Sequence, residues 1–285
     1  MIIFAAAKLN ITMEKYNTIR YWVEDLPKMG KITFTQEEIE EQFPTMPVQH
    51  IRNTLQRLTK KKTLQSTGRG FFVVVPAEYG LKGIVPPIEY IDRMMQSINR
   101  EYYVGLLSAA ALHGAAHQQP QEFTLIVDTN NLRDKLKRGV KINFVAKKNI
   151  PHAYIKPIMT KSGYVKVSNP ELTAMDLLLY VREIGGINRA ATVLNELAEV
   201  MNFSHVGQDF FRYFNAAVVQ RLGYILDDVL EQTKLADTLY QKAIGANVKF
   251  RKYPLKVVLK GAKLSDYPVN DKWKIIINEQ IEIDE

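Results

Sequence analysis

Residues Pro47–Pro76 carry the pattern that most limits what this chain can fold into. Apolar residues in the first half recur at the spacing of one helix face, which predicts a helix from Pro47 to about Lys61. Its apolar positions are Val48, Ile51, Leu55 and Leu58. Two β-prone runs follow, and the Thr-Gly-Arg-Gly between them favours a tight hairpin with Arg69 at its tip. These runs are Thr63–Ser66 and Phe71–Val75.

Two further helices are predicted before this stretch. Met13–Lys28 has apolar residues at helical spacing and is closed by Gly30. Thr35 is followed three residues later by Glu38, a capping box that predicts a short helix to about Phe43. The order is therefore three helices and then a hairpin, which is typical of a winged helix-turn-helix. In such domains the third helix enters the major groove of DNA.

The charge of the chain is concentrated in the same stretch. The protein has a formal net charge of +8, and Pro47–Pro76 holds six bases and no acid. Such a local patch favours a polyanionic partner, most often nucleic acid, although a basic helix face is in many proteins only solvated. Arg, Asn and Gln side chains can read base edges, and Lys can hold phosphate. The candidate DNA-binding residues are Gln49, Arg52, Asn53, Gln56, Arg57, Lys60, Lys61, Lys62 and Arg69.

A chain of 285 residues is long enough for two domains. Residues 77–87 are rich in Gly and Pro and are interpreted as a linker or crossing loop. We therefore expect an α+β protein, with a winged helix-turn-helix domain at residues 1–80 and a larger mixed α+β domain with C-terminal helices at 81–285. Residues 1–12 are expected to be an extension.

The larger domain is predicted to mix strands with helices. Ser168-Asn169-Pro170-Glu171 is a strong helix start, because it joins a cap, a first-turn proline and an acid. Residues 131–139 are polar and fit either a short helix or a loop. The other predicted helices are at 88–98 and 103–113, with two or three more in 187–244. Strands are predicted at 122–128, 140–146, 153–159, 164–167, 254–260 and 273–277.

No pattern of residues in this chain predicts catalysis. The protein has no cysteine. It contains neither of the two glycine-rich phosphate-binding patterns, G-x-x-x-x-G-K-[ST] and G-x-G-x-x-G. His113 and His117 are four residues apart, but Gly114 stands where a metalloprotease has Glu. Ser108 lacks the flanking glycines of a nucleophile elbow, and we expect it to bond back to its own helix. The acids Asp128, Asp176, Asp227 and Asp228 define no acid/base pair, and the last two are expected to be solvated. We expect no cofactor and no metal.

Three segments after the basic stretch resemble one family. They are YVGLLSAAALHGAAHQQP at 103–120, EFTLIVD at 122–128 and VSNPELTAMDLL at 167–178. Together with the N-terminal pattern, their order and spacing resemble the AbiEi-type antitoxins of type IV, or abortive-infection, toxin–antitoxin systems. The resemblance covers most of the chain up to about Asn202.

This resemblance implies two roles. The N-terminal domain would bind operator DNA and repress its own operon, as a homodimer or cooperatively on inverted repeats. The larger domain would counteract a nucleotidyltransferase-type toxin without forming a stable complex with it. The toxin's own Gly-Ser…Asp-x-Asp-like signature is absent, so the chain resembles the antitoxin half.

Two alternatives stay open at this stage. The winged helix could contact protein and have no DNA role, or an enzyme site could be assembled from scattered residues of the larger domain. The start of the chain lacks the basic residue and the longer apolar run of a signal peptide, and no segment is apolar enough to span a membrane. A cytoplasmic protein without membrane contact is therefore expected.

Overall fold

The computed structural model describes residues 18–68, 70–115, 120–129, 131–132, 135–137, 140–258 and 263–283. Its mixture of helices and strands confirms the predicted α+β class. The chain divides into two compact units. The N-terminal unit comprises Met1–Glu101, Asp134–Ile142 and Ile158–Val165, and the C-terminal unit comprises the rest. The domain boundary expected near residue 80 stays a prediction.

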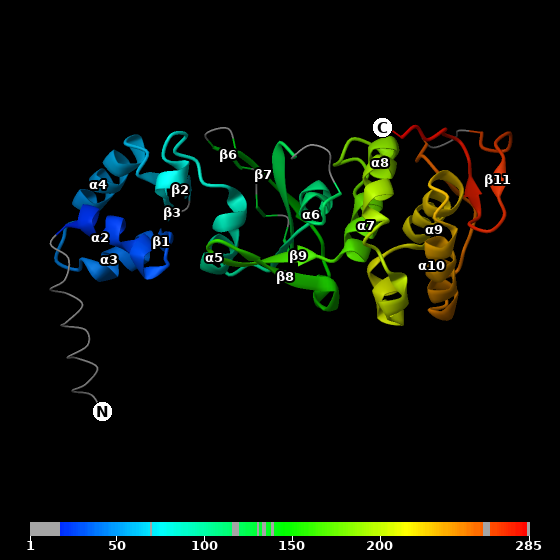
Figure 1. The fold of residues 1–285 in the computed structure, drawn as a ribbon, viewed down its shortest axis with the longest axis horizontal. Coiled ribbons are helices and arrows are strands. Elements are labelled where there is room, and N and C mark those ends of the chain that lie inside the picture. The colour runs from blue at the N-terminus through cyan, green and yellow to red at the C-terminus, as the bar shows by residue number, and fades with distance from the viewer. Residues whose placement is uncertain are drawn as a thin grey trace, which may run out of the picture. The chain divides into compact units, whose positions relative to one another are not determined.

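The N-terminal unit contains the three helices and the hairpin in the predicted order (Figure 1). Its main elements are α2 (Ile19–Asp25), β1 (Thr33–Thr35), α3 (Gln36–Gln42), α4 (Val48–Lys60), β2 (Leu64–Gly68), β3 (Phe71–Val74) and α5 (Ile91–Ser97). Residues 13–17 of the first predicted helix lie outside the described residues. A 3-10 turn, Leu26–Met29, extends α2 and ends at Gly30, whose φ of 72° is left-handed. Sequence patterns missed β1, which pairs with β3 in a sheet of order β1-β3-β2.

Local signals and tertiary packing agree in this unit. Thr35 and Glu38 form the predicted capping box at the start of α3. Behind the helices, the Trp22 ring meets Phe34 edge-on at 5.0 Å and Phe43 at 6.1 Å. Ile39 and Leu55 are buried in the same cluster. Apolar burial of this kind supplies most of the stability of helices this short, which would not persist alone.

The C-terminal unit combines most of a six-stranded sheet with helices (Figure 1). The sheet order is β6-β7-β5-β4-β9-β8. Its strands are β4 (Tyr102–Val104), β5 (Glu122–Val127), β6 (Lys135–Lys137), β7 (Val140–Ala146), β8 (Ile155–Thr160) and β9 (Gly163–Ser168). The helices are α6 (Leu106–Leu112), α7 (Pro170–Leu179), α8 (Ile187–Leu197), α9 (Ala216–Tyr224) and α10 (Thr233–Gly245), and α9 runs on as a π-helical turn, Ile225–Val229. A small second sheet joins β10 (Tyr253–Pro254), β12 (Ile275–Ile276) and β11 (Val269–Asn270).

Two elements predicted for residues 81–285 were wrong because the chain pairs there as a strand. The helix expected over 103–113 begins only at Leu106, because Tyr102–Val104 pair with β5 and β9 as β4. Gly105 separates the strand from the helix, and a Cβ there would lie 2.8 Å from the Ile126 side chain. Part of the segment 131–139, expected as helix or loop, forms β6. In both cases a partner strand distant in sequence decided the structure.

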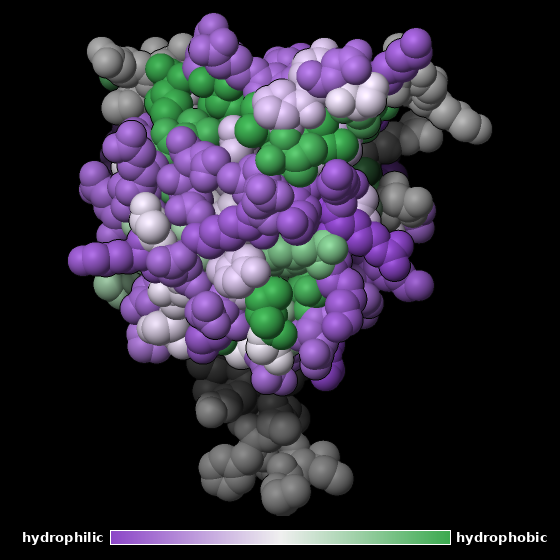
Figure 2. Space-filling view, turned by 90° about the vertical axis from the view of Figure 1, so that its right-hand side faces the viewer, coloured by the Kyte–Doolittle hydropathy of each residue, from purple (hydrophilic) through white to green (hydrophobic). Residues whose placement is uncertain are grey.

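The helices and the small sheet share one large apolar core. Trp273 is fully buried there, and its ring lies 5.4 Å from Tyr240 and 5.8 Å from Phe250. Gln220, also fully buried, donates from its amide to the carbonyls of Arg251 and Trp273. Figure 2 shows the face around α10 and β11, where polar residues separate the apolar ones into small groups.

Candidate nucleic-acid interface

Helix α4 has two chemically different faces. Ile51, Leu55 and Leu58 are buried against the other helices and β2, as predicted, and Thr54 is buried beside them. Val48 was assigned to the same face, and this was wrong, because its side chain is 43% exposed. It is the first residue of α4, so its side chain belongs to the turn that projects beyond the buried cluster.

The opposite face of α4 is exposed along its whole length. The structure describes eight of the nine candidate residues, and all eight are exposed: Gln49, Arg52, Asn53, Gln56, Arg57, Lys60, Lys61 and Lys62. The Gln49 amide donates to Oδ1 of Asn53 at 2.9 Å, so these two side chains are held together before any ligand arrives. Within the described parts of the chain, no acid pairs with any of the five bases. Their charge is therefore available to an external anion.

The end of α4 is joined to the loop after the hairpin. Lys62 has a left-handed φ of 62°, and its ammonium donates to the Leu81 carbonyl at 3.3 Å. Lys82, the residue after Leu81, is exposed. Sequence reasoning treated 77–87 only as a linker and so missed Lys82. One lysine in a Gly- and Pro-rich stretch gave no signal that could have identified it.

The hairpin itself is anchored at both ends. The Gln36 N–H at the start of α3 donates to the Gly70 carbonyl at 2.7 Å. At the base, the Val85 N–H donates to Oε1 of the buried Gln65 at 2.7 Å. Gly68 and Gly70 have φ values of 96° and 71°, which explains why glycine stands on both sides of the turn. Arg69, the predicted tip, lies outside the described residues.

The C-terminal unit contains a buried charged cluster that sequence reasoning did not find. The Lys147 ammonium donates to Oδ1 of Asp176 at 2.5 Å, and the Tyr103 hydroxyl donates to Oδ2 at 2.6 Å. All three residues are buried, and Lys147 lies 4.4 Å from the centroid of the Phe214 ring. Burial raises the pKa of the Asp176 carboxyl, and the Lys147 charge opposes that shift. Burial also raises the pKa of Tyr103 well above its usual value, with the Asp176 charge acting in the same direction.

The motif Ser168–Leu177 has a structural role at the start of α7. Asn169 caps the helix by accepting from the Leu172 N–H, as predicted. The Ser168 hydroxyl lies 2.7 Å from that of Thr173, and it donates to the Val104 carbonyl. Oε1 of Glu171 accepts from the Asn202 N–H at 2.6 Å. The polar residues of the motif therefore join α7 to β4 and to the chain after α8, which explains their spacing without chemistry.

Other candidates for chemistry turn out to be structural. The Ser108 hydroxyl accepts from the Thr124 N–H at 2.9 Å and donates to the Glu122 carbonyl, so its expected bond to its own helix was wrong. Asp227, expected to be solvated, accepts from Lys272 at 2.6 Å and from the Trp273 indole at 2.9 Å.

The structure describes one member of the histidine pair, His113. His113 Nε2 lies 2.7 Å from the Ser168 carbonyl, and His117 is outside the described residues. Where the structure is described, no group of His, Asp and Glu is arranged to hold a metal ion. None of the helices described there is long and apolar enough to cross a bilayer.

Comparison with solved structures identifies the fold. The RV2827C protein from Mycobacterium tuberculosis is similar over 89% of this chain and 88% of its own, with a TM-score of 0.62 and 12% identity. At that identity, the likeness concerns the fold alone. An antigenic nucleotidyltransferase-like protein from Paracoccidioides brasiliensis covers 53% of this chain and 89% of its own, at 11% identity and a TM-score of 0.37, which supports no conclusion.

Comparison with protein families finds a match to part of the chain. Residues 103–228 match the family described as the AbiEi antitoxin C-terminal domain. This match agrees with the resemblance of the motifs in 103–178 to the AbiEi-type antitoxins. No curated protein matches the sequence.

Proposed function

We propose that this protein is a DNA-binding antitoxin that represses its own operon and counteracts a nucleotidyltransferase-type toxin. The observation that carries the DNA-binding half is the exposed face of α4, where five basic residues, one Asn and two Gln form no ion pair with an acid among the described residues. The antitoxin half rests on the family match of residues 103–228. The buried Ser108, Lys147, Glu171 and Asp176 of that region are engaged in structural contacts, which favours a binding role over catalysis.

The N-terminal unit would act as a winged helix-turn-helix. Helix α4 would lie in the major groove, with Arg52, Asn53 and Gln56 facing base edges. Lys60 and Lys61, at the end of the helix, would contact phosphates and fix the position of the helix. The hairpin after α4 would reach the neighbouring DNA backbone, where Arg69 would contact a phosphate.

Salt should weaken DNA binding steeply if the basic residues of the N-terminal unit contact DNA phosphates. Each neutralised phosphate releases counterions, and phosphate contacts from Arg57, Lys60, Lys61, Lys62 and Arg69 would give a slope of log K against log salt of about −4 to −5. Between roughly 50 and 200 mM salt, the affinity for duplex DNA should fall on the order of 10²–10³-fold. Fluorescence anisotropy with the DNA upstream of the protein's own reading frame measures this slope. A slope near zero would instead support a winged helix that contacts protein.

The antitoxin role is tested by growth. Co-expression with the nucleotidyltransferase toxin of the same operon should restore growth that the toxin alone stops. The triple variant Arg52→Ala/Asn53→Ala/Gln56→Ala should still restore growth, because it leaves the C-terminal unit unchanged, but it should no longer repress a reporter behind the operon's promoter. Loss of both activities in a folded triple variant would contradict the division of roles between the two units.

A further inference from the structure

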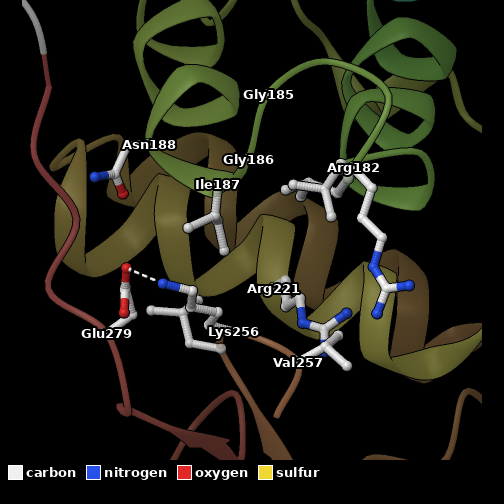
Figure 3. Close-up of a pocket in the computed structure, with 12 residues that line it drawn as sticks. Arg182, Gly185, Gly186, Ile187, Asn188, Arg221, Lys256, Val257 and Glu279 are labelled. Carbon is white, nitrogen blue, oxygen red and sulfur yellow. Dashed lines mark hydrogen bonds and ion pairs between the residues drawn. The ribbon is translucent and has the colours of Figure 1, made fainter. Parts of the chain in front are cut away.

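The C-terminal unit contains a cavity that none of these roles uses (Figure 3). It has a volume of about 360 Å³, within the range of small-molecule sites. It lies where the chain after α7, the start of α8 and helix α9 meet the segments around residues 256 and 279. Leu178, Ile187 and Leu255 give it an apolar wall, and two arginines, one lysine and one glutamate give it charge.

The two arginines are the unusual feature. The half-buried Arg221 donates from Nε and Nη2 to the Pro254 carbonyl at 3.1 and 2.9 Å. These bonds fix the guanidinium but leave its charge uncompensated, and burial lowers its pKa. Arg182 reaches the same side of the cavity from the chain after α7 (Figure 3). Among the residues that the structure describes, neither arginine pairs with a carboxylate.

Lys256, the lysine of the cavity, is paired with a carboxylate. The Lys256 ammonium lies 2.7 Å from Oε1 of Glu279, so these two charges cancel (Figure 3). The cavity is thus left with two positive charges, both on guanidinium groups. Keeping the half-buried Arg221 guanidinium without a counter-ion is costly, so the site favours an anion whose charge matches the two guanidinium groups.

Two further groups line the cavity on the α8 side. Gly186, with a φ of 111°, is the N-cap residue before α8 and offers no capping side chain to the first N–H groups of that helix. Oδ1 of Asn188 is buried and has no hydrogen-bond partner in the structure. Helix N–H groups favour an anion, and a lone amide oxygen favours a ligand with a donor group.

We propose that this cavity binds a small organic phosphate monoester, with the phosphate on Arg182 and Arg221 and the organic part against the apolar wall. A monoester carries about −1.5 to −2 charges near pH 7, which matches two guanidinium groups, whereas a carboxylate or a nucleic-acid phosphodiester carries only one. Guanidinium groups also bind phosphate through paired hydrogen bonds. Among the described residues that line the cavity, none is Ser, Thr, Tyr, His or Cys, and Lys256 and Glu279 are paired with each other, so the site favours binding over nucleophilic catalysis.

Calorimetric titration of the full chain tests the proposal with three probes. Phenyl phosphate combines the dianion with an apolar body, benzoate has the same body with one charge, and inorganic phosphate has no body. We expect phenyl phosphate to bind at least tenfold more tightly than either of the others. Arg182→Gln should weaken phenyl phosphate at least tenfold, because it removes one charge-assisted contact. Arg182 is exposed and makes no hydrogen bond that the structure describes, so this variant should fold normally.

The matched control is Lys234→Gln, which removes the same charge from the exposed surface of α10. Phenyl phosphate should bind this variant as it binds the unmodified protein. The proposal is overturned if the unmodified protein binds no phenyl phosphate, if benzoate binds equally well, or if both variants lose affinity alike. Displacement of phenyl phosphate by a duplex oligonucleotide would also overturn it, because the cavity would then belong to a nucleic-acid surface.

Discussion

Asp176→Asn should lower the free energy of unfolding of the C-terminal unit by about 3–5 kcal/mol, because it leaves the buried Lys147 ammonium without a counter-charge. Asp176 is fully buried, and the Lys147 side chain is only 6% exposed, so water cannot replace the lost carboxylate. A loss of this size is comparable to the whole stability of many domains, about 5–15 kcal/mol. Urea unfolding followed by circular dichroism measures it.

Two comparisons distinguish a buried pair from an ordinary surface contact. Lys161→Gln breaks the exposed pair with Glu78 and should leave the unfolding midpoint unchanged. The triple change Lys147→Met/Asp176→Leu/Tyr103→Phe removes both charges and the hydroxyl together, and it should regain most of the stability, because no buried polar group is left unpaired. If Asp176→Asn unfolds at the same urea concentration as the unmodified protein, the cluster does not hold this unit together.

The contrast between the two units shows what sequence patterns can reveal. Helices α3 and α4 were predictable because their signals are local, namely the Thr35–Glu38 capping box and a four-position apolar face. The outer face of α4 followed from the same periodicity, since residues opposite a buried stripe must be exposed. The one error on this helix, Val48, concerns its first turn, where periodicity does not indicate how far the neighbouring elements extend.

The C-terminal unit depends on partners that periodicity cannot pair. The carboxylate of Asp176 bonds to side chains 29 and 73 positions away, and β4 exists only because β5 and β9 lie on either side of it. Arg182, Arg221 and Lys256 meet at one cavity from three separate segments. The family resemblance pointed to Ser168–Leu177 through its order and spacing, but only the fold shows that these residues hold α7 in place.

A second large effect is expected at the exposed face of α4, where contacts with DNA bases can be separated from contacts with phosphates. Arg52→Ala/Asn53→Ala/Gln56→Ala should reduce affinity for the operator to about the level of unrelated DNA. Each base-reading contact contributes about 1–3 kcal/mol to discrimination, so losing two or three of them removes most of the preference. Anisotropy titrations of the operator and of a scrambled duplex, at one fixed salt concentration, give both affinities.

The matched control is Lys60→Ala/Lys61→Ala, which removes two exposed lysines at the C-terminal end of α4 and leaves Arg52, Asn53 and Gln56 unchanged. It should weaken the operator and the scrambled duplex by the same factor and make the salt slope shallower by about 2, since each lost phosphate contact contributes about 0.9. If the triple variant keeps its preference for the operator while the lysine variant loses it, then sequence is read from the end of α4 and the loop that contains Lys82. If neither variant changes DNA binding, the basic face of α4 is a protein-contact surface or simply a solvated one.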